Sequence, residues 1–430
     1  MIKTLKLAAL CWLACSIAAL SAQVTAVRCQ RMLDVKTGSY VHNAVVLIQD
    51  GKIVAAGSGL AIPADAKIVD LGTKTLLPGL IDAHTHLMAR VAEGPQNDNY
   101  ILQLAKKSEA YRALEGAVDA RLTLQAGFTS VRDVESEGAG YADVALRTAI
   151  DRGLVEGPRM QVSTRAIAAT GGYLPVRLSP DLRDFPRGAQ TITGADEARR
   201  AVREEIYYGA DLIKVYADFL DVGSPNTTNF MHETLTREEI RTVVEEAHKG
   251  GHHVAAHAMT REGIRNAVES GVDSIEHGTH VDKETLAVMA AKGTYLVPTS
   301  AAISRDYDAA KTPREREEME PEMQALREEI SNARAAHVKI ATGFDASNDD
   351  TQGKNAQELM SLVKLGLSPL EAIQAATTVA SELMGWQDSI GSIDKGKYAD
   401  LIAVDGDPLH DISLLQHVSF VMKGGAEVKH

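Results

Sequence analysis

The sequence predicts an α/β protein in which a (β/α)8 TIM barrel is joined to a small β-sandwich domain formed from both chain ends. Through the middle of the chain, short apolar runs alternate with amphipathic stretches, a pattern typical of parallel strands connected by helices. Both ends instead show short apolar runs separated by Gly and Asp turns. The 430 residues are enough for one large barrel and one small domain.

Apolar segments of the middle region are the expected barrel strands. They are residues 76–83, 129–134, 159–163, 212–215, 253–258, 274–277, 295–299 and 340–344. Amphipathic helical stretches such as 237–249 and 260–270 separate most of them. Eight strands that alternate with helices favour a barrel. A doubly wound open sheet is the alternative, but no Gly-rich phosphate-binding sequence follows the first strand.

The two chain ends have the same pattern of short apolar runs and turns, and they flank the predicted barrel. We expect residues 23–78 and 386–430 to build the two parts of the β-sandwich, and residues 79–385 to form the barrel. Asp50-Gly51 lies between two apolar runs, and an Asp-Gly pair in this setting predicts a hairpin turn.

Residues 1–22 have the pattern of a secretory signal peptide. Lys3 and Lys6 precede an apolar run over 7–20, and small residues then allow cleavage before Gln23. The apolar run is too short for a membrane span. We therefore expect a secreted or periplasmic protein, and Cys15 leaves lipid attachment open.

Composition narrows the classes of partner. The formal net charge of −13 is unfavourable for binding nucleic acid, because no basic stripe is present to displace counterions. After signal cleavage only Cys29 would remain, which excludes an intrachain disulfide. The sequence therefore predicts neither a nucleic-acid partner nor a membrane span.

Metal-ligating side chains recur at the ends of the predicted strands. His84 and His86 close the first strand, and residues two apart on a strand face the same side. Four further residues end other strands: Lys214, His257, His277 and Asp345. A barrel gathers its chemistry at the C-terminal strand ends, and imidazole is the commonest metal ligand. The pattern therefore predicts a metal site.

These residues resemble the amidohydrolase superfamily, specifically its imidazolonepropionase-like branch, which includes metallo-dipeptidases of the prolidase and lysine/arginine-carboxypeptidase kinds and ochratoxinases. The resemblance extends from about Ala44 to Gly425. It includes Pro78-Gly79-Leu80-Ile81-Asp82 and the closing Val421-Met422-Lys423-Gly424-Gly425.

The resemblance implies a set of two divalent ions, with zinc the expected metal and manganese or cobalt as substitutes. His84, His86 and Asp345 would hold the more buried ion. His257 and His277 would hold the second, and Lys214, carboxylated by CO₂, would bridge the two. Asp345 would then act as general base and afterwards as general acid in catalysis.

Substrate contacts are expected at Arg132, Tyr173, Tyr216 and His280, which lie at or just beyond strand ends. Many dipeptidases of the branch carry Gly-Gly-His after strand three, whereas this chain has Gly-Gly-Tyr at 171–173. The difference leaves the metal ligands intact and the substrate class open.

The resemblance implies hydrolysis of an amide or peptide bond, with release of a C-terminal amino acid from a dipeptide or N-acyl amino acid. An ochratoxin-like aryl amide would also fit. The first alternative is a mononuclear deaminase or cyclic-amide hydrolase, which generally lacks a lysine corresponding to Lys214. The second is a non-catalytic assembly scaffold. Relatives of this kind often form homo-oligomers, octamers in particular.

Overall fold

The computed structural model describes residues 23–91, 96–175, 178–182, 184–221, 230–348 and 351–429. The predicted signal peptide, including Cys15, lies outside these residues, so secretion and lipid attachment stay predictions. No helix in the described part of the chain is long and apolar enough to cross a membrane.

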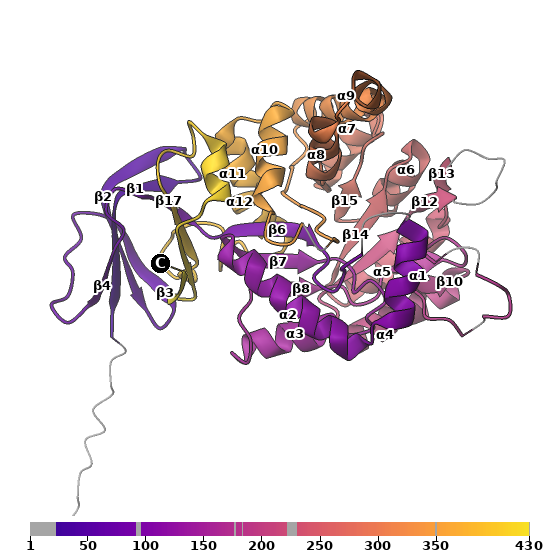
Figure 1. Ribbon diagram of the computed structural model, residues 1–430, viewed down its shortest axis with the longest axis horizontal. Helices are drawn as coiled ribbons and strands as arrows, with labels where there is room; N and C mark the ends of the chain where they lie inside the picture. Colours follow the sequence, from indigo (N-terminus) through magenta and orange to yellow (C-terminus); the bar gives the residue numbers. More distant parts are fainter. Residues whose placement is uncertain are drawn as a thin grey trace, which may run out of the picture.

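Strands from both ends of the chain lie in one eight-stranded sheet (Figure 1). Its order is β19-β18-β17-β5-β1-β2-β3, and β4 pairs with β1. The bounds are β1 Thr25–Asp34, β2 Ser39–Gln49, β3 Lys52–Ser58, β4 Lys67–Asp70, β5 Thr75–Pro78, β17 Leu401–Val404, β18 Phe420–Lys423 and β19 Ala426–Lys429. The description as a β-sandwich, with its domain boundaries, stays a prediction.

The hairpin predicted at Asp50-Gly51 is confirmed. β2 and β3 pair antiparallel across it, and both turn residues have positive φ, 51° and 75°, as a two-residue hairpin turn requires. Apolar side chains of this sheet form their own core, which includes Val27, Val46, Ile53, Leu76 and Phe420.

The remaining main strands form two parallel sheets. β6-β7-β8 is three-stranded and β10-β9-β11-β14-β15-β16 is six-stranded. The bounds are β6 Leu80–Thr85, β7 Phe128–Asp133, β8 Arg159–Val162, β9 Ile167–Ala169, β10 Gln190–Ile192, β11 Leu212–Tyr216, β14 His253–Ala258, β15 Ser274–His277 and β16 Tyr295–Val297. Asp211 N donates to Val162 O at 2.8 Å and so links the end of β8 to the start of β11.

The predicted eighth strand, 340–344, is corrected by the structure. Only an isolated parallel bridge, between Ile340 and Leu296, forms there. The segment nevertheless bonds to both neighbours: Ala341 N donates to Leu296 O at 2.9 Å, and Ala83 N donates to Thr342 O at 2.8 Å. It therefore lies between β16 and β6, and the fold is TIM-barrel-like. Strand pairing does not continue because Thr342 N donates to Ala375 O at 3.0 Å and Phe344 N donates to a side-chain acceptor.

The predicted first strand, 76–83, is divided at Gly79. Residues before it belong to the end sheet and residues after it to the parallel sheet. Gly79 N donates to Asp400 O at 2.8 Å, and a Cβ added at Gly79 would lie 2.1 Å from Thr129 Oγ1. Glycine is therefore needed where the chain passes from one sheet to the other.

Helices cover the outside of the parallel strands (Figure 1). Their bounds are α1 Gln96–Lys106, α2 Glu109–Gln125, α3 Ala142–Asp151, α4 Ala195–Tyr208, α5 Arg237–Lys249, α6 Arg261–Ser270, α7 Lys283–Lys292, α8 Ala301–Ala309, α9 Pro313–Ala335, α10 Ala356–Lys364, α11 Pro369–Ala375 and α12 Thr378–Leu383. The prediction of a helix over 237–249 is confirmed, and Thr236 and Glu239 form a capping box at its start. Thr260 caps the next predicted helix. A hairpin, β12 (Asp218–Asp221) with β13 (Phe230–Glu233), follows β11.

Candidate metal centre

All six predicted ligands line one cavity of about 690 Å³. His84 lies on β6, Lys214 on β11, His257 on β14 and His277 at the end of β15. His86 and Asp345 follow β6 and the bridged segment after β16. The C-terminal strand ends therefore bring together side chains that are up to 261 residues apart (345 − 84).

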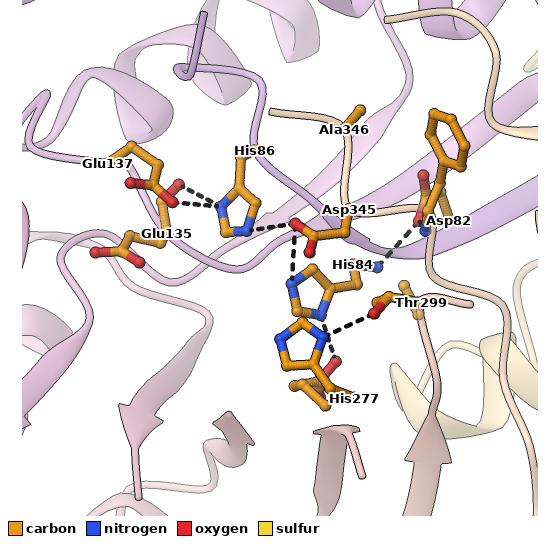
Figure 2. Close-up of polar contacts among 12 residues, drawn as sticks. Asp82, His84, His86, Glu135, Glu137, His277, Thr299, Asp345 and Ala346 are labelled. Atoms are coloured by element: carbon orange, nitrogen blue, oxygen red, sulfur yellow. Dashed lines mark hydrogen bonds and ion pairs between the residues drawn. The ribbon is translucent and has the colours of Figure 1, made fainter. Parts of the chain in front are cut away.

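The ligands converge on Asp345. Its Oδ1 lies 3.7 Å from His84 Nε2 and 3.3 Å from His86 Nε2 (Figure 2). Ligand atoms of His84, His277 and Asp345 lie within 4.8 Å of one another, close enough to hold one ion. The His277 ring is also 4.5 Å from the ring of His257. His277 thus lies between the expected ligands of the two ions.

Strained backbone holds two of these ligands in place. His277 has φ 71° and Asp345 has φ 58°, and a left-handed conformation costs a non-glycine residue about 1–3 kcal/mol. Asp345 N donates to His84 O at 2.7 Å. Such strain persists only where surrounding contacts enforce it.

Asp82 enforces this geometry and was missed by the sequence analysis. Its Oδ1 accepts hydrogen bonds from His84 N (3.1 Å) and Phe344 N (3.0 Å), and its Oδ2 accepts one from Asn355 Nδ2 (2.6 Å). One buried carboxylate therefore joins the backbone of β6 to the segment that carries Asp345. The signal was an acid inside the apolar run Ile81-Asp82-Ala83.

Outer contacts orient the imidazoles. His84 Nδ1 lies 2.7 Å from Glu276 Oε2, and His277 Nδ1 lies 2.7 Å from Thr299 Oγ1. With Nδ1 engaged in this way, Nε2 is left to bind a metal. Glu276, on β15 and fully buried, was also missed, since its partner lies on a distant strand.

Arg132 does not reach the cavity, which corrects its expected substrate contact. The side chain is buried, and its Nη2 donates to Glu276 Oε1 at 2.7 Å. Its Nε donates to Ala83 O at 2.6 Å. Arg132 therefore holds the carboxylate that holds His84. His280 is exposed and is not a lining residue either, because the turn after β15 directs Thr279 to the cavity instead.

Among the described residues that line the cavity, two buried nitrogens have no hydrogen-bond partner: Lys214 Nζ and His257 Nε2. Asp218 Oδ1 is 3.7 Å from His257 Nε2, too far for a hydrogen bond. Burial lowers the pKa of Lys214 and holds the pKa of His257 well below its usual range, so that the imidazole is neutral. Unpaired buried nitrogens of this kind are costly. This donor set fits metal ions.

Tyr173 and Tyr216 do line the cavity. Their hydroxyls donate to Glu135 Oε2, Tyr173 at 3.2 Å and Tyr216 at 2.5 Å, and Tyr173 also donates to Glu137 Oε2 at 3.0 Å. Neither glutamate was predicted. The signal was a run of acids at every second residue, Asp133, Glu135 and Glu137, directly after a buried strand.

Known proteins resemble this chain over nearly its whole length. The model of the amidohydrolase family matches residues 75–428. Ochratoxinase from Aspergillus niger is 32% identical over 417 residues, covering 90% of this chain and 83% of that protein. A solved Xaa-Pro dipeptidase with bound methionine in its active site superposes with a TM-score of 0.83 at 31% identity, covering 95% of this chain and all of the other. Imidazolonepropionase from Streptococcus gordonii is 26% identical over 391 residues, 86% of each chain.

Proposed function

Because the chain belongs to the amidohydrolase family and is a hydrolase of amide bonds, we propose that it is a binuclear metalloenzyme. In this proposal it releases a C-terminal amino acid from a dipeptide or an N-acyl amino acid. His84, His86 and Asp345 would hold one divalent ion, expected to be zinc, and His257 and His277 the other.

The unpartnered Lys214 Nζ carries this proposal. The lysine is buried at the base of the cavity and has no hydrogen-bond acceptor within the described residues. Addition of CO₂ to the neutral amine forms an N–C bond and releases a proton, which yields a carbamate. The two carbamate oxygens would then give each ion a ligand, so that a costly buried amine becomes a bridging anion.

When bound, the ions would supply Lewis-acid activation of the scissile carbonyl and of water. The chain itself would manage the proton. Asp345 faces the cavity with 28% of its side chain exposed, more than either His84 or His86. Its carboxylate would accept a proton from the attacking water and then deliver that proton to the departing amine nitrogen.

The names of the relatives support the choice of substrate class. Ochratoxinase and the Xaa-Pro dipeptidase are named for substrates with an amide bond to a C-terminal amino acid. Tyr173, Tyr216 and Phe219 give the cavity an aromatic wall that suits bulky groups, aryl amides included. A panel of dipeptides and N-acyl amino acids, with release of free amino acid as the readout, tests this choice.

Metal content separates the proposal from the mononuclear alternative that the imidazolonepropionase similarity raises. We expect two ions per wild-type chain, and at most one in Lys214→Ala with most activity lost. Lys423→Ala is the matched control. Lys423 is a partly buried lysine too, but it lies on β18 of the end sheet and has a hydrogen-bond acceptor, Gly157 O. This control should keep both ions. One ion per wild-type chain together with an active Lys214→Ala would overturn the binuclear proposal.

A further inference from the structure

One wall of the cavity combines aromatic rings with acids. This tyrosine–glutamate wall consists of five residues that line the cavity, Tyr100, Tyr173, Tyr216, Phe219 and Glu137, and of the fully buried Glu135, which accepts hydrogen bonds from Tyr173 and Tyr216. The ring of Tyr173 lies 4.4 Å from that of Tyr216, 5.0 Å from that of Phe219 and 6.1 Å from that of Tyr100. The rings therefore form one continuous aromatic surface.

The carboxylates of the wall are buried against these rings. Glu135 is fully buried and Glu137 is 7% exposed, and Glu137 itself lines the cavity. Glu135 Oε1 and the hydroxyl of Tyr100 have no hydrogen-bond partner within the described residues. Tyr100 is 2% exposed and lines the cavity. Of these two unpartnered groups, the Tyr100 hydroxyl belongs to a residue that lines the cavity, whereas Glu135 is buried away from it.

Protein cations nearby do not fully neutralise the wall. Arg112 Nε and Nη2 donate to Met88 O and Ser136 O rather than to either carboxylate. His86 Nδ1 lies 3.6 Å from Glu137 Oε1, within ion-pair distance, and 3.3 Å from Glu135 O. As a metal ligand His86 would be a neutral imidazole, with no charge to offset Glu137. Carboxylation of the neutral Lys214 amine would add a negative charge to the same cavity. A buried acidic pair of this kind is costly until a cation approaches it.

We propose that the tyrosine–glutamate wall is an ammonium-binding subsite, so that the preferred substrates are amides carrying a protonated amine. Aromatic faces attract cations, and buried carboxylates add charge-assisted hydrogen bonds. The amine could be the free α-amino group of a dipeptide or a basic side chain. This inference rests on the proposed function, because it names the substrate class of the same cavity.

A set of matched substrates distinguishes the two sources of the amine. N-acetyl-Gly-Leu has neither amine, Gly-Leu adds the free α-amino group, and N-acetyl-Gly-Lys adds a basic side chain. We expect the metal-loaded enzyme to favour one of the amine-bearing compounds by about tenfold or more in kcat/KM. Glu137→Gln should reduce this ratio toward one. Asp306→Asn, which removes an acid that lines the same cavity from α8, should leave the ratio unchanged.

Two results would overturn the subsite: equal kcat/KM for all three compounds in the wild type, or an unchanged ratio in Glu137→Gln, which includes an equal loss on all three compounds. Such an equal loss would show that Glu137 only positions His86. Calorimetric binding of benzylamine against benzyl alcohol gives a readout that needs no turnover. If no compound is hydrolysed but benzylamine binds about tenfold more tightly, dependent on Glu137, the proposed function fails while the subsite stands. Equal binding of the two probes overturns the subsite.

Discussion

The two halves of the metal centre are built differently. On the side of β6, protein contacts fix each ligand: Glu276 holds His84, and Asp82 joins the backbone of His84 to the segment that carries Asp345. On the side of β11 and β14, Lys214 Nζ and His257 Nε2 have no hydrogen-bond partner within the described residues. The first half is thus organised by the protein alone. In the second half only His277 is held by a protein contact, from Thr299, whereas Lys214 and His257 depend on what they bind.

Asp345→Asn gives the largest expected effect on the anchored half. Asparagine keeps the shape and one ligand oxygen but cannot carry the proton, and general acid–base catalysis typically contributes about 10²–10⁴-fold. We expect kcat to fall by that amount while most of the metal is retained, as measured by turnover and elemental analysis. Equal losses of metal and activity would mean that Asp345 acts only as a ligand.

Glu276→Gln tests whether the anchors themselves matter. The amide cannot serve both His84 and Arg132 as the carboxylate does, and loss of such outer contacts typically lowers metal affinity about 10–100-fold. A competitive chelator titration measures this. Thr299→Val, which removes the single hydroxyl contact of His277, should have a smaller effect. The reverse order would contradict the importance of the anchored half.

Lys214→Met sharpens the comparison from the other half. Methionine replaces a buried, unpartnered amine with an apolar side chain and so removes the cost of an unsatisfied buried donor, about 1–3 kcal/mol. In the presence of chelator, urea unfolding should therefore show the variant to be at least as stable as the wild type. With metal bound, the order should reverse. A variant less stable than the wild type in both conditions would show that Lys214 has a partner without metal.

Substitution of Glu358 gives the smallest expected effect, a change in how the free energy of unfolding depends on pH. Burial raises its pKa from 4.5 to about 8, against hydrogen bonds from Ser300 and Ala301 that lower it. The folded state therefore binds the proton more tightly than the unfolded state. The contribution of Glu358 to stability is complete below pH 4.5 and is lost as the pH rises to about 8. Urea titrations at pH 5, 6.5 and 8 should show that the free energy of unfolding falls less over this interval in Glu358→Gln than in the wild type. Equal slopes would refute the raised pKa.

The sequence predicted the ligands better than their supports. His84, His257 and His277 could be found because each stands at the end of an apolar run, which is a local pattern. The role of Arg132 could not be found from a local pattern, because it is set by Glu276, 144 residues away. Arginine at a strand end is compatible with binding a substrate carboxylate or an internal one, and only the fold, which brings Arg132 on β7 to Glu276 on β15, decides between them.

The fold shows the same division between local and distant causes. Most strands of the parallel sheets follow the apolar runs closely, but β9 and β10 were not expected and β16 ends at Val297 rather than at 299. Two further boundaries differ for reasons that lie far along the chain. The break at Gly79 depends on contacts with Thr129 and Asp400. The shortened pairing after Ile340 depends on Ala375 O and on the carboxylate of Asp82. None of these partners lies within the segment whose boundary it sets.

The passage of the chain through Gly79 also sets an order of events during synthesis. β5 pairs with β17, Pro78 opposite Leu401, and β6 continues directly to His84. Ribosomes release the N-terminal part first, at about 5–20 residues per second. β5, which leads to the strand of the first ligand, therefore cannot complete its pairing until β17, one of the last strands, has been synthesised. Metal loading at His84 should be a late, post-translational step, completed only by a nearly full-length chain.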